Sequence, residues 1–202
     1  MFWIVLYLHP RNNSYIIKLM KAYILDYITA LRFKPTEPTL AIRIFDPSAR
    51  PDKQPSKDWM RDELECWDNG PTAPFDKSQY AAVHQYTFSD VDTEHPDKIM
   101  AAYALHYALE NPHLVISKDI ANKIIHDFNQ AYQKVDTVML HCNMGVYRSP
   151  AVALALEKLF NLRFEWQGRA AFLIPSYQAD DFVGNFMIYN TLLHCGNQYL
   201  HS

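Results

Sequence analysis

The chain contains 202 residues, of which 49% are hydrophobic and 20% are charged. This composition is typical of a globular protein, and the length predicts a single domain, residues 1–202, with a sizeable core. The formal net charge of −3 provides no basic surface for a nucleic-acid backbone, so we expect no nucleic-acid partner.

Three widely spaced cysteines, Cys66, Cys142 and Cys195, form neither a disulfide framework nor a zinc-binding set. This pattern favours a reducing compartment. The apolar start, MFWIVLYL, is too short to span a membrane and lacks the basic residues that open a signal peptide. We therefore expect a cytoplasmic protein without a membrane partner, in which these first residues form a strand.

Three segments follow in the first part of the chain. Apolar residues recur at helical spacing from Ser14 to Arg32, which predicts a helix ended by the prolines of residues 35–38. Residues 39–45, TLAIRIF, are β-rich and lead into a turn, which predicts a core strand. Residues 48–79 are polar and rich in proline, so we interpret them as a surface excursion with one short helix near KDWMRDELECW.

The middle of the chain alternates strands and helices. Residues 80–88 read as a strand, residues 89–97 (SDVDTEHPD) as an acidic loop, and the segment from about Pro96 to Glu110 as a helix. Ser117 is suited to cap the next helix, which has Asp119 in its first turn. The predicted apolar face of that helix consists of Ala121, Ile124, Ile125, Phe128 and Tyr132.

The segment VDTVMLH, residues 135–141, is nearly free of polar side chains at its end, as in a strand covered on both faces. The tail is predicted to be helical through ADDFVGNFMIYNTLLH, residues 179–194. Strands that alternate with helices predict an α/β domain, with a central, mostly parallel sheet of about four to five strands flanked by helices.

A cysteine lies at the end of the strand in VMLHCNMGVYRSPAVALAL, residues 138–156. Ligands of open α/β sheets bind beyond the carboxyl ends of the strands. A helix that begins near Ser149-Pro150 points its N-terminus at the same place, where the backbone N–H groups of residues 143–148 can converge on an anion. This positive field favours the thiolate form of Cys142, which is the nucleophilic form.

Two more residue types in this stretch suit a phosphate. Arg148 offers a planar fork that matches two phosphate oxygens, and Gly145 permits a tight turn with close backbone approach. The segment therefore predicts attack of the Cys142 thiolate on a bound phosphoryl group. The second His-Cys pair serves as a comparison, because the residue six positions after Cys195 is His201 rather than arginine; we interpret Cys195 as a packing or surface residue.

Residues 141–149, HCNMGVYRS, resemble the signature loop of cysteine-dependent protein tyrosine phosphatases. That loop has His-Cys, two residues, Gly, two residues, Arg, and then Ser or Thr. The continuation SPAVALAL is similar to the small bacterial and phage members of the dual-specificity-like branch. LAIRIFDP, YTFSDVD, SKDIANKIIHDF and NFMIYNTLL are similar to segments of that branch in the same order, so the resemblance covers roughly residues 39–193.

The resemblance implies a protein tyrosine phosphatase-like fold and a role for each loop residue. Cys142 would attack phosphorus and become a phosphocysteine, His141 would help to set the loop and the thiolate, and Ser149 would stabilise the thiolate as it leaves. No cofactor or metal is implied, and the remaining histidines lack metal-ligand spacing. The implied phosphate-binding residues are Asn143, Met144, Gly145, Val146, Tyr147 and Arg148.

Expulsion of the leaving group needs a proton donor, and the resemblance implies an aspartate on a separate loop. The candidates are Asp90 and Asp92, and we favour Asp90 because of the F-x-D pattern around it. Asp68 and Asp46 are the remaining choices.

The expected substrate is a phosphorylated protein or another phosphomonoester. Met144 occupies a position where many members of the family have alanine, and no segment matches the tyrosine-recognition loop of the larger enzymes, so phosphotyrosine and phosphoserine/threonine both stay open. Two other functions use the same kind of loop: a catalytically silent phosphate-binding module and a sulfur transferase. The sequence leaves the oligomeric state open.

Overall fold

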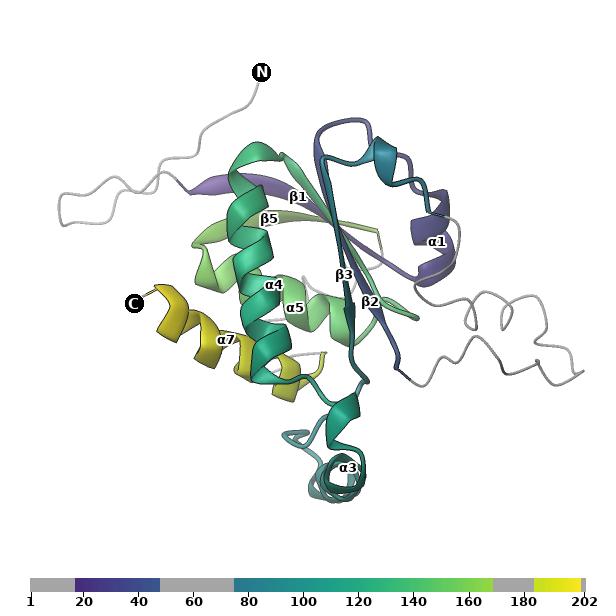
Figure 1. Ribbon diagram of the computed structural model, residues 1–202, viewed down its shortest axis with the longest axis vertical. Helices are drawn as coiled ribbons and strands as arrows, with labels where there is room; N and C mark the ends of the chain where they lie inside the picture. The colour runs from purple at the N-terminus through teal and green to yellow at the C-terminus, as the bar shows by residue number, and fades with distance from the viewer. Residues whose placement is uncertain (1–16, 48–74, 169–183, 201–202) are drawn as a thin grey trace, which may run out of the picture.

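A computed structural model describes residues 17–47, 75–168 and 184–200. Within them, five strands form one sheet in the order β3-β2-β4-β1-β5, and every neighbouring pair is parallel (Figure 1). This α/β architecture, with helices on both faces of the sheet, confirms the predicted fold class. The strands are β1 (Lys18–Leu25), β2 (Thr39–Phe45), β3 (Ala82–Thr87), β4 (Thr137–His141) and β5 (Leu162–Gly168).

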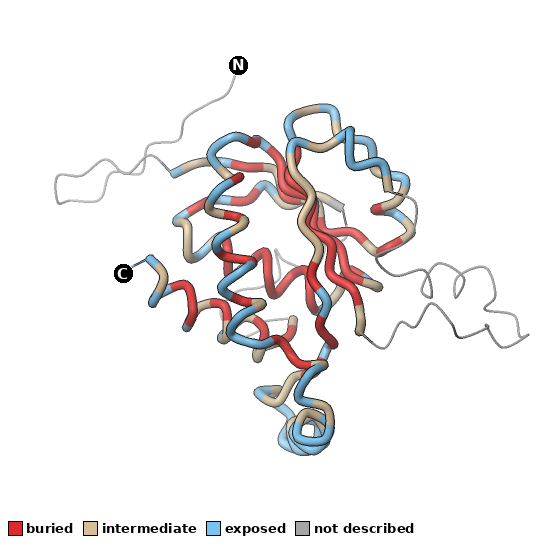
Figure 2. Tube along the Cα trace, in the orientation of Figure 1, coloured by how far each residue is buried: buried red, intermediate tan, exposed pale blue. Residues whose placement is uncertain are grey.

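Helices cover the sheet unequally. On one face, α4, α5 and α7 pack over the main core, whereas α1 and the turn η2 lie on the other face with a smaller apolar cluster (Figures 1 and 2). The helical elements are α1 (Tyr27–Arg32), η2 (Lys77–Gln79), α3 (Lys98–Glu110), η3 (Pro112–Leu114), α4 (Lys118–Ala131), η4 (Tyr132–Lys134), α5 (Arg148–Leu159) and α7 (Phe186–Leu200).

The two strands β2 and β4 are apolar in sequence because they are buried inside the sheet. All seven residues of β2 and all five of β4 are buried, as expected for parallel strands covered on both faces. The strands predicted over residues 39–45, 80–88 and 135–141 are therefore confirmed, and β4 delivers its last residue, His141, to the carboxyl edge of the sheet.

The helix predicted from Ser14 to Arg32 is wrong over residues 18–25 and is confirmed over residues 27–32. Residues 18–25 form β1, and only 27–32 are helical. Met20 and Ile24 are compatible with either periodicity, but Ala22 between them is buried as well, which is the period of two of a strand. Parallel pairing with both β4 and β5 stabilises this strand. The strand β5 itself was not predicted.

The later helices agree with the sequence in most respects. The Ser117 hydroxyl oxygen accepts a hydrogen bond from the backbone N–H of Ile120, which caps α4 as predicted. The predicted apolar face of α4 is buried, except that Tyr132 is only partly covered. The helix predicted from about Pro96 to Glu110 is α3, and within the described residues the tail helix α7 begins at Phe186 and extends to Leu200.

Some predictions fall outside the described residues: the N-terminal strand, most of the excursion at 48–79 with its short helix, Cys66 and Asp68. Of the part that is described, no helix is long and apolar enough to cross a membrane.

Candidate active site

The candidate nucleophile lies in the loop that joins β4 to α5. β4 ends at His141, α5 begins at Arg148, and residues 142–147 curl between them at the carboxyl edge of the sheet. Gly145 has a φ of +69°, and a Cβ atom there would lie 2.7 Å from the carbonyl carbon and oxygen of Leu25. Only glycine fits this backbone without strain, as the sequence predicted for the tight turn.

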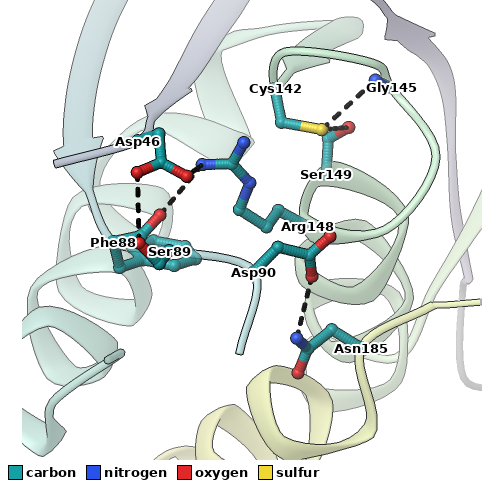
Figure 3. Close-up of polar contacts among 9 residues, drawn as sticks. All are labelled: Asp46, Phe88, Ser89, Asp90, Cys142, Gly145, Arg148, Ser149 and Asn185. Carbon is teal, nitrogen blue, oxygen red and sulfur yellow. Dashed lines mark hydrogen bonds and ion pairs between the residues drawn. The ribbon is translucent and has the colours of Figure 1, made fainter. Parts of the chain in front are cut away.

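The thiol of Cys142 faces into this loop. Cys142 is 3% exposed. Its Sγ accepts hydrogen bonds from the backbone N–H of Gly145 at 3.2 Å and from the hydroxyl of Ser149 at 3.3 Å (Figure 3). Both donors stabilise negative charge on sulfur. The predicted nucleophile and the predicted stabiliser of the leaving thiolate are thus in direct contact.

Arg148 is held at the ends of two neighbouring strands. Its Nη1 donates a hydrogen bond to the backbone carbonyl of Phe88 at 3.0 Å and lies 3.7 Å from Oδ2 of Asp46. The other carboxylate oxygen of Asp46 accepts a hydrogen bond from the Ser89 hydroxyl at 3.1 Å. These contacts fix a buried guanidinium beside the thiol loop, and they occupy Asp46, which was one of the alternative proton donors (Figure 3).

Asp90 and Asp92 have different surroundings. The Asp92 carboxylate accepts hydrogen bonds at 3.1 Å from the backbone N–H groups of Phe186 and Met187, so it caps the N-terminus of α7. Asp90 instead accepts one hydrogen bond, at 2.9 Å, from the side-chain amide of Asn185 (Figure 3). Of these two aspartates, Asp90 is therefore the one whose carboxylate does not cap a helix, and its residue is the more exposed of the two.

The environment of Asp90 favours its protonated form. Although the residue is open to solvent, surrounding protein atoms crowd its carboxyl group, and this partial desolvation raises the pKa above the ordinary value of 3.8. The hydrogen bond from Asn185 and the charge of Arg148 act in the opposite direction, whereas the charges of Asp92 and Asp46 raise the pKa further. A raised pKa is what a proton donor near neutral pH requires.

Sequence reasoning did not single out Asn185. Its residue is 1% exposed; Oδ1 accepts a hydrogen bond from the backbone N–H of Ile188 at 2.9 Å, which caps α7, while Nδ2 holds Asp90. Asparagine is among the preferred N-cap residues, so the asparagine that precedes FMIYNTLL offered a signal for the start of this helix. Its bond to Asp90 joins segments 95 positions apart and has no local signature.

His141 is buried and uncharged. Its Nε2 accepts a hydrogen bond at 3.1 Å from Nε of the buried Arg43, a residue that sequence reasoning also missed. Burial, together with the charge of Arg43, lowers the pKa of His141 to about 3. The histidine therefore shapes the loop by packing, with its ring against those of Tyr27 and Phe45, and supplies no positive charge at neutral pH.

The remaining loop residues differ in exposure. Met144 is 50% exposed and Tyr147 is 47% exposed, while Asn143 and Val146 are half-buried. The backbone carbonyl of Asn143 accepts a hydrogen bond from the N–H of Tyr27, which ties the loop to α1. Met144 and Tyr147 thus give the loop two large exposed apolar side chains.

The second cysteine of the described residues lies outside the site. Cys195 is 2% exposed within α7, and burial raises the pKa of its thiol, so it is a packing residue, one of the two roles predicted for it. The described residues contain no group of His, Cys, Asp or Glu that could hold a metal ion.

Comparison of the chain with protein-family models, with curated proteins and with solved structures gave no match.

Proposed function

We propose that the protein is a cysteine-dependent phosphatase that hydrolyses phosphomonoesters, with a phosphorylated protein as its substrate. The observation that carries the proposal is the pair of hydrogen bonds from Gly145 and Ser149 to the sulfur of Cys142, in a loop closed by Arg148 at the start of a helix. A buried thiol of purely structural function needs no convergent donors of this kind.

In the first step, the Cys142 thiolate attacks phosphorus, an S–P bond forms, and the bond to the leaving oxygen breaks. Arg148 and the loop N–H groups neutralise the phosphoryl oxygens. The Asp90 carboxyl group gives its proton to the leaving oxygen, so an alcohol or phenol departs and a carboxylate remains. The raised pKa of Asp90 supports this role.

In the second step, the Asp90 carboxylate accepts a proton from water while the water oxygen attacks phosphorus. The S–P bond breaks, inorganic phosphate leaves, and sulfur recovers the thiolate form. The Ser149 hydroxyl, 3.3 Å from Sγ, stabilises the departing thiolate. A free thiol is needed throughout, which suits the reducing, cytoplasmic setting that the cysteine pattern favours.

The site favours a substrate with an apolar group next to its phosphate. Met144 and Tyr147 are exposed in the thiol loop, and the loop has no lysine or arginine between Cys142 and Arg148. This composition disfavours highly charged inositol phosphates and suits an aromatic or aliphatic phosphoester, as in a phosphorylated protein side chain.

The test is hydrolysis of p-nitrophenyl phosphate between about pH 5 and pH 8 by the wild type, Cys142→Ser and the matched control Cys195→Ala. We expect turnover by the wild type and by Cys195→Ala, and none by Cys142→Ser, because only Cys142 lies among the loop donors. Wild-type protein without turnover at every pH would overturn the proposal.

Two further assays separate the alternative functions. Binding of inorganic phosphate without turnover would identify a silent phosphate-binding module. Transfer of sulfur from thiosulfate to cyanide at a higher rate than phosphoester hydrolysis would identify a sulfur transferase. Phosphotyrosine and phosphoserine peptides, compared by kcat/KM, then define the protein substrate.

A further inference from the structure

The helix α3 is apolar and uncovered. None of its 13 residues is buried, and it lies at the lower end of the view in Figure 1, apart from the sheet and the other helices (Figures 1 and 2). It is nevertheless well formed, because the Asp97 carboxylate accepts hydrogen bonds from the backbone N–H groups of Ile99 and Met100. A stable helix thus projects from the body with its side chains in solvent.

The exposed apolar area of α3 is large. With roughly 200 Å² for one large side chain, the exposed fractions of its six large apolar residues amount to on the order of 700 Å². The largest apolar patch of a typical monomer is about 300–600 Å², and one partner of a standard protein interface contributes about 800 Å². The six residues are Ile99 (68%), Met100 (55%), Tyr103 (73%), Leu105 (51%), Tyr107 (41%) and Leu109 (74%).

The side chains of α3 differ in exposure around the helix. Ala101, Ala104 and Ala108 are half-buried and share one side of the helix. The large apolar residues lie on the rest of the circumference. A helix that is apolar all round is normally buried on all sides, so α3 needs a covering partner in addition to its own domain.

The charges of α3 suit a second copy of the same helix. Its formally charged residues are Lys98 at the N-terminal end and Glu110 at the C-terminal end, where Glu110 also lies 3.5 Å from His106. In an antiparallel pair, each Lys98 lies near the Glu110 of the other copy, and the helix dipoles oppose favourably. The same surface is therefore complementary to itself.

A lipid surface fits α3 less well. Helices that lie on membranes carry lysine and arginine on their polar side, whereas α3 has only Lys98. The loop before it carries Asp90, Asp92, Glu94 and Asp97, and anionic lipids would repel these carboxylates.

We propose that two copies of the chain associate through their α3 helices, packed antiparallel about a twofold axis with Tyr103 near its centre. Tyrosine and methionine are enriched in protein interfaces, and both occur on this face. This proposal does not depend on phosphatase activity, so either can fail without the other.

The test is sedimentation equilibrium of the full chain at about 1–100 μM. The wild type is expected to dimerise, and Tyr103→Glu is expected to raise the dimer Kd at least about thirtyfold because it buries a charge at the centre of the interface. Leu200→Glu is the matched control, since Leu200 is an exposed apolar residue of α7 and its substitution leaves the dimer unchanged.

A charge exchange tests the antiparallel arrangement. Lys98→Glu is expected to weaken the dimer about tenfold, because two ion pairs become repulsive by symmetry, and the double variant Lys98→Glu/Glu110→Lys restores it. A wild type that is monomeric at 100 μM, or a dimer that Tyr103→Glu leaves intact, overturns the proposal. Flotation of a monomeric wild type with phosphatidylcholine vesicles would also overturn it, and would assign α3 to lipid.

Discussion

The hydrogen bond from Asn185 to Asp90 makes a sharp prediction about the pH dependence of catalysis. In Asn185→Ser, the serine hydroxyl still offers an acceptor to the N-terminus of α7. The substitution removes the side-chain amide that donates a hydrogen bond to the Asp90 carboxylate at 2.9 Å. This amide stabilises the ionised carboxylate and lowers its pKa. Its loss raises the pKa of Asp90.

The sign follows from the proposed role of Asp90 as proton donor. The donor must be protonated, so kcat/KM falls as the pH rises through the pKa of Asp90. Asn185→Ser therefore shifts the descending limb of the profile to higher pH. The lost bond also loosens the donor; a net contribution of about 1 kcal/mol corresponds to a roughly fivefold lower kcat/KM at the optimum.

The assay is a pH profile of p-nitrophenyl phosphate and aryl phosphates with poorer leaving groups. The variant Asp90→Asn shows whether the descending limb belongs to Asp90, because this variant is expected to lack that limb. Its activity on the poorer leaving groups is expected to fall about 10²-fold. Asn190→Ser is a control on the same helix, since Asn190 contacts Glu94 and not Asp90. A limb that stays in place or moves to lower pH in Asn185→Ser would refute the reasoning.

Three further predictions follow from the site. Asp92→Ala removes a helix cap and a like charge, so Tm falls by about 3 °C and the descending limb moves to lower pH, opposite to Asn185→Ser. Gly145→Ala forces a Cβ against the backbone of Leu25 at positive φ; differential scanning calorimetry should show a Tm lower by about 5 °C or more, with weaker binding of inorganic phosphate. Ser149→Ala slows release of the thiolate, so rapid-quench experiments should show a burst of p-nitrophenol followed by slow turnover; a linear time course would argue against this role.

Local sequence was sufficient for the centre of the site. The β4 strand, the glycine turn and the helix start at Arg148 are contiguous in the chain, so their spacing predicted where the thiol, the turn and the guanidinium lie. The fold class followed similarly from the alternation of strands and helices. The two hydrogen bonds to the Cys142 thiol depend on residues that are close in sequence.

The parts that sequence reasoning missed depend on distant pairings. The residues of β1 alternate correctly for a strand, but a helix fits the same apolar positions, and the choice is made by β4 and β5 on either side. Arg43 approaches His141 only because β2 and β4 pair in that register. Asn185 reaches Asp90 only because α7 folds back beside the acidic loop.

The position of β4 in the strand order has a consequence for the reactivity of Cys142. Edge strands of a sheet open most easily, and here the edges are β3 and β5, whereas β4 has a neighbour on each side. The backbone amides of β4 should exchange hydrogen only through near-global unfolding. Opening of β4 is therefore not expected to expose the Cys142 thiol, which directly follows this strand; chemical modification of Cys142 in the folded protein would report on the loop of residues 142–147 alone.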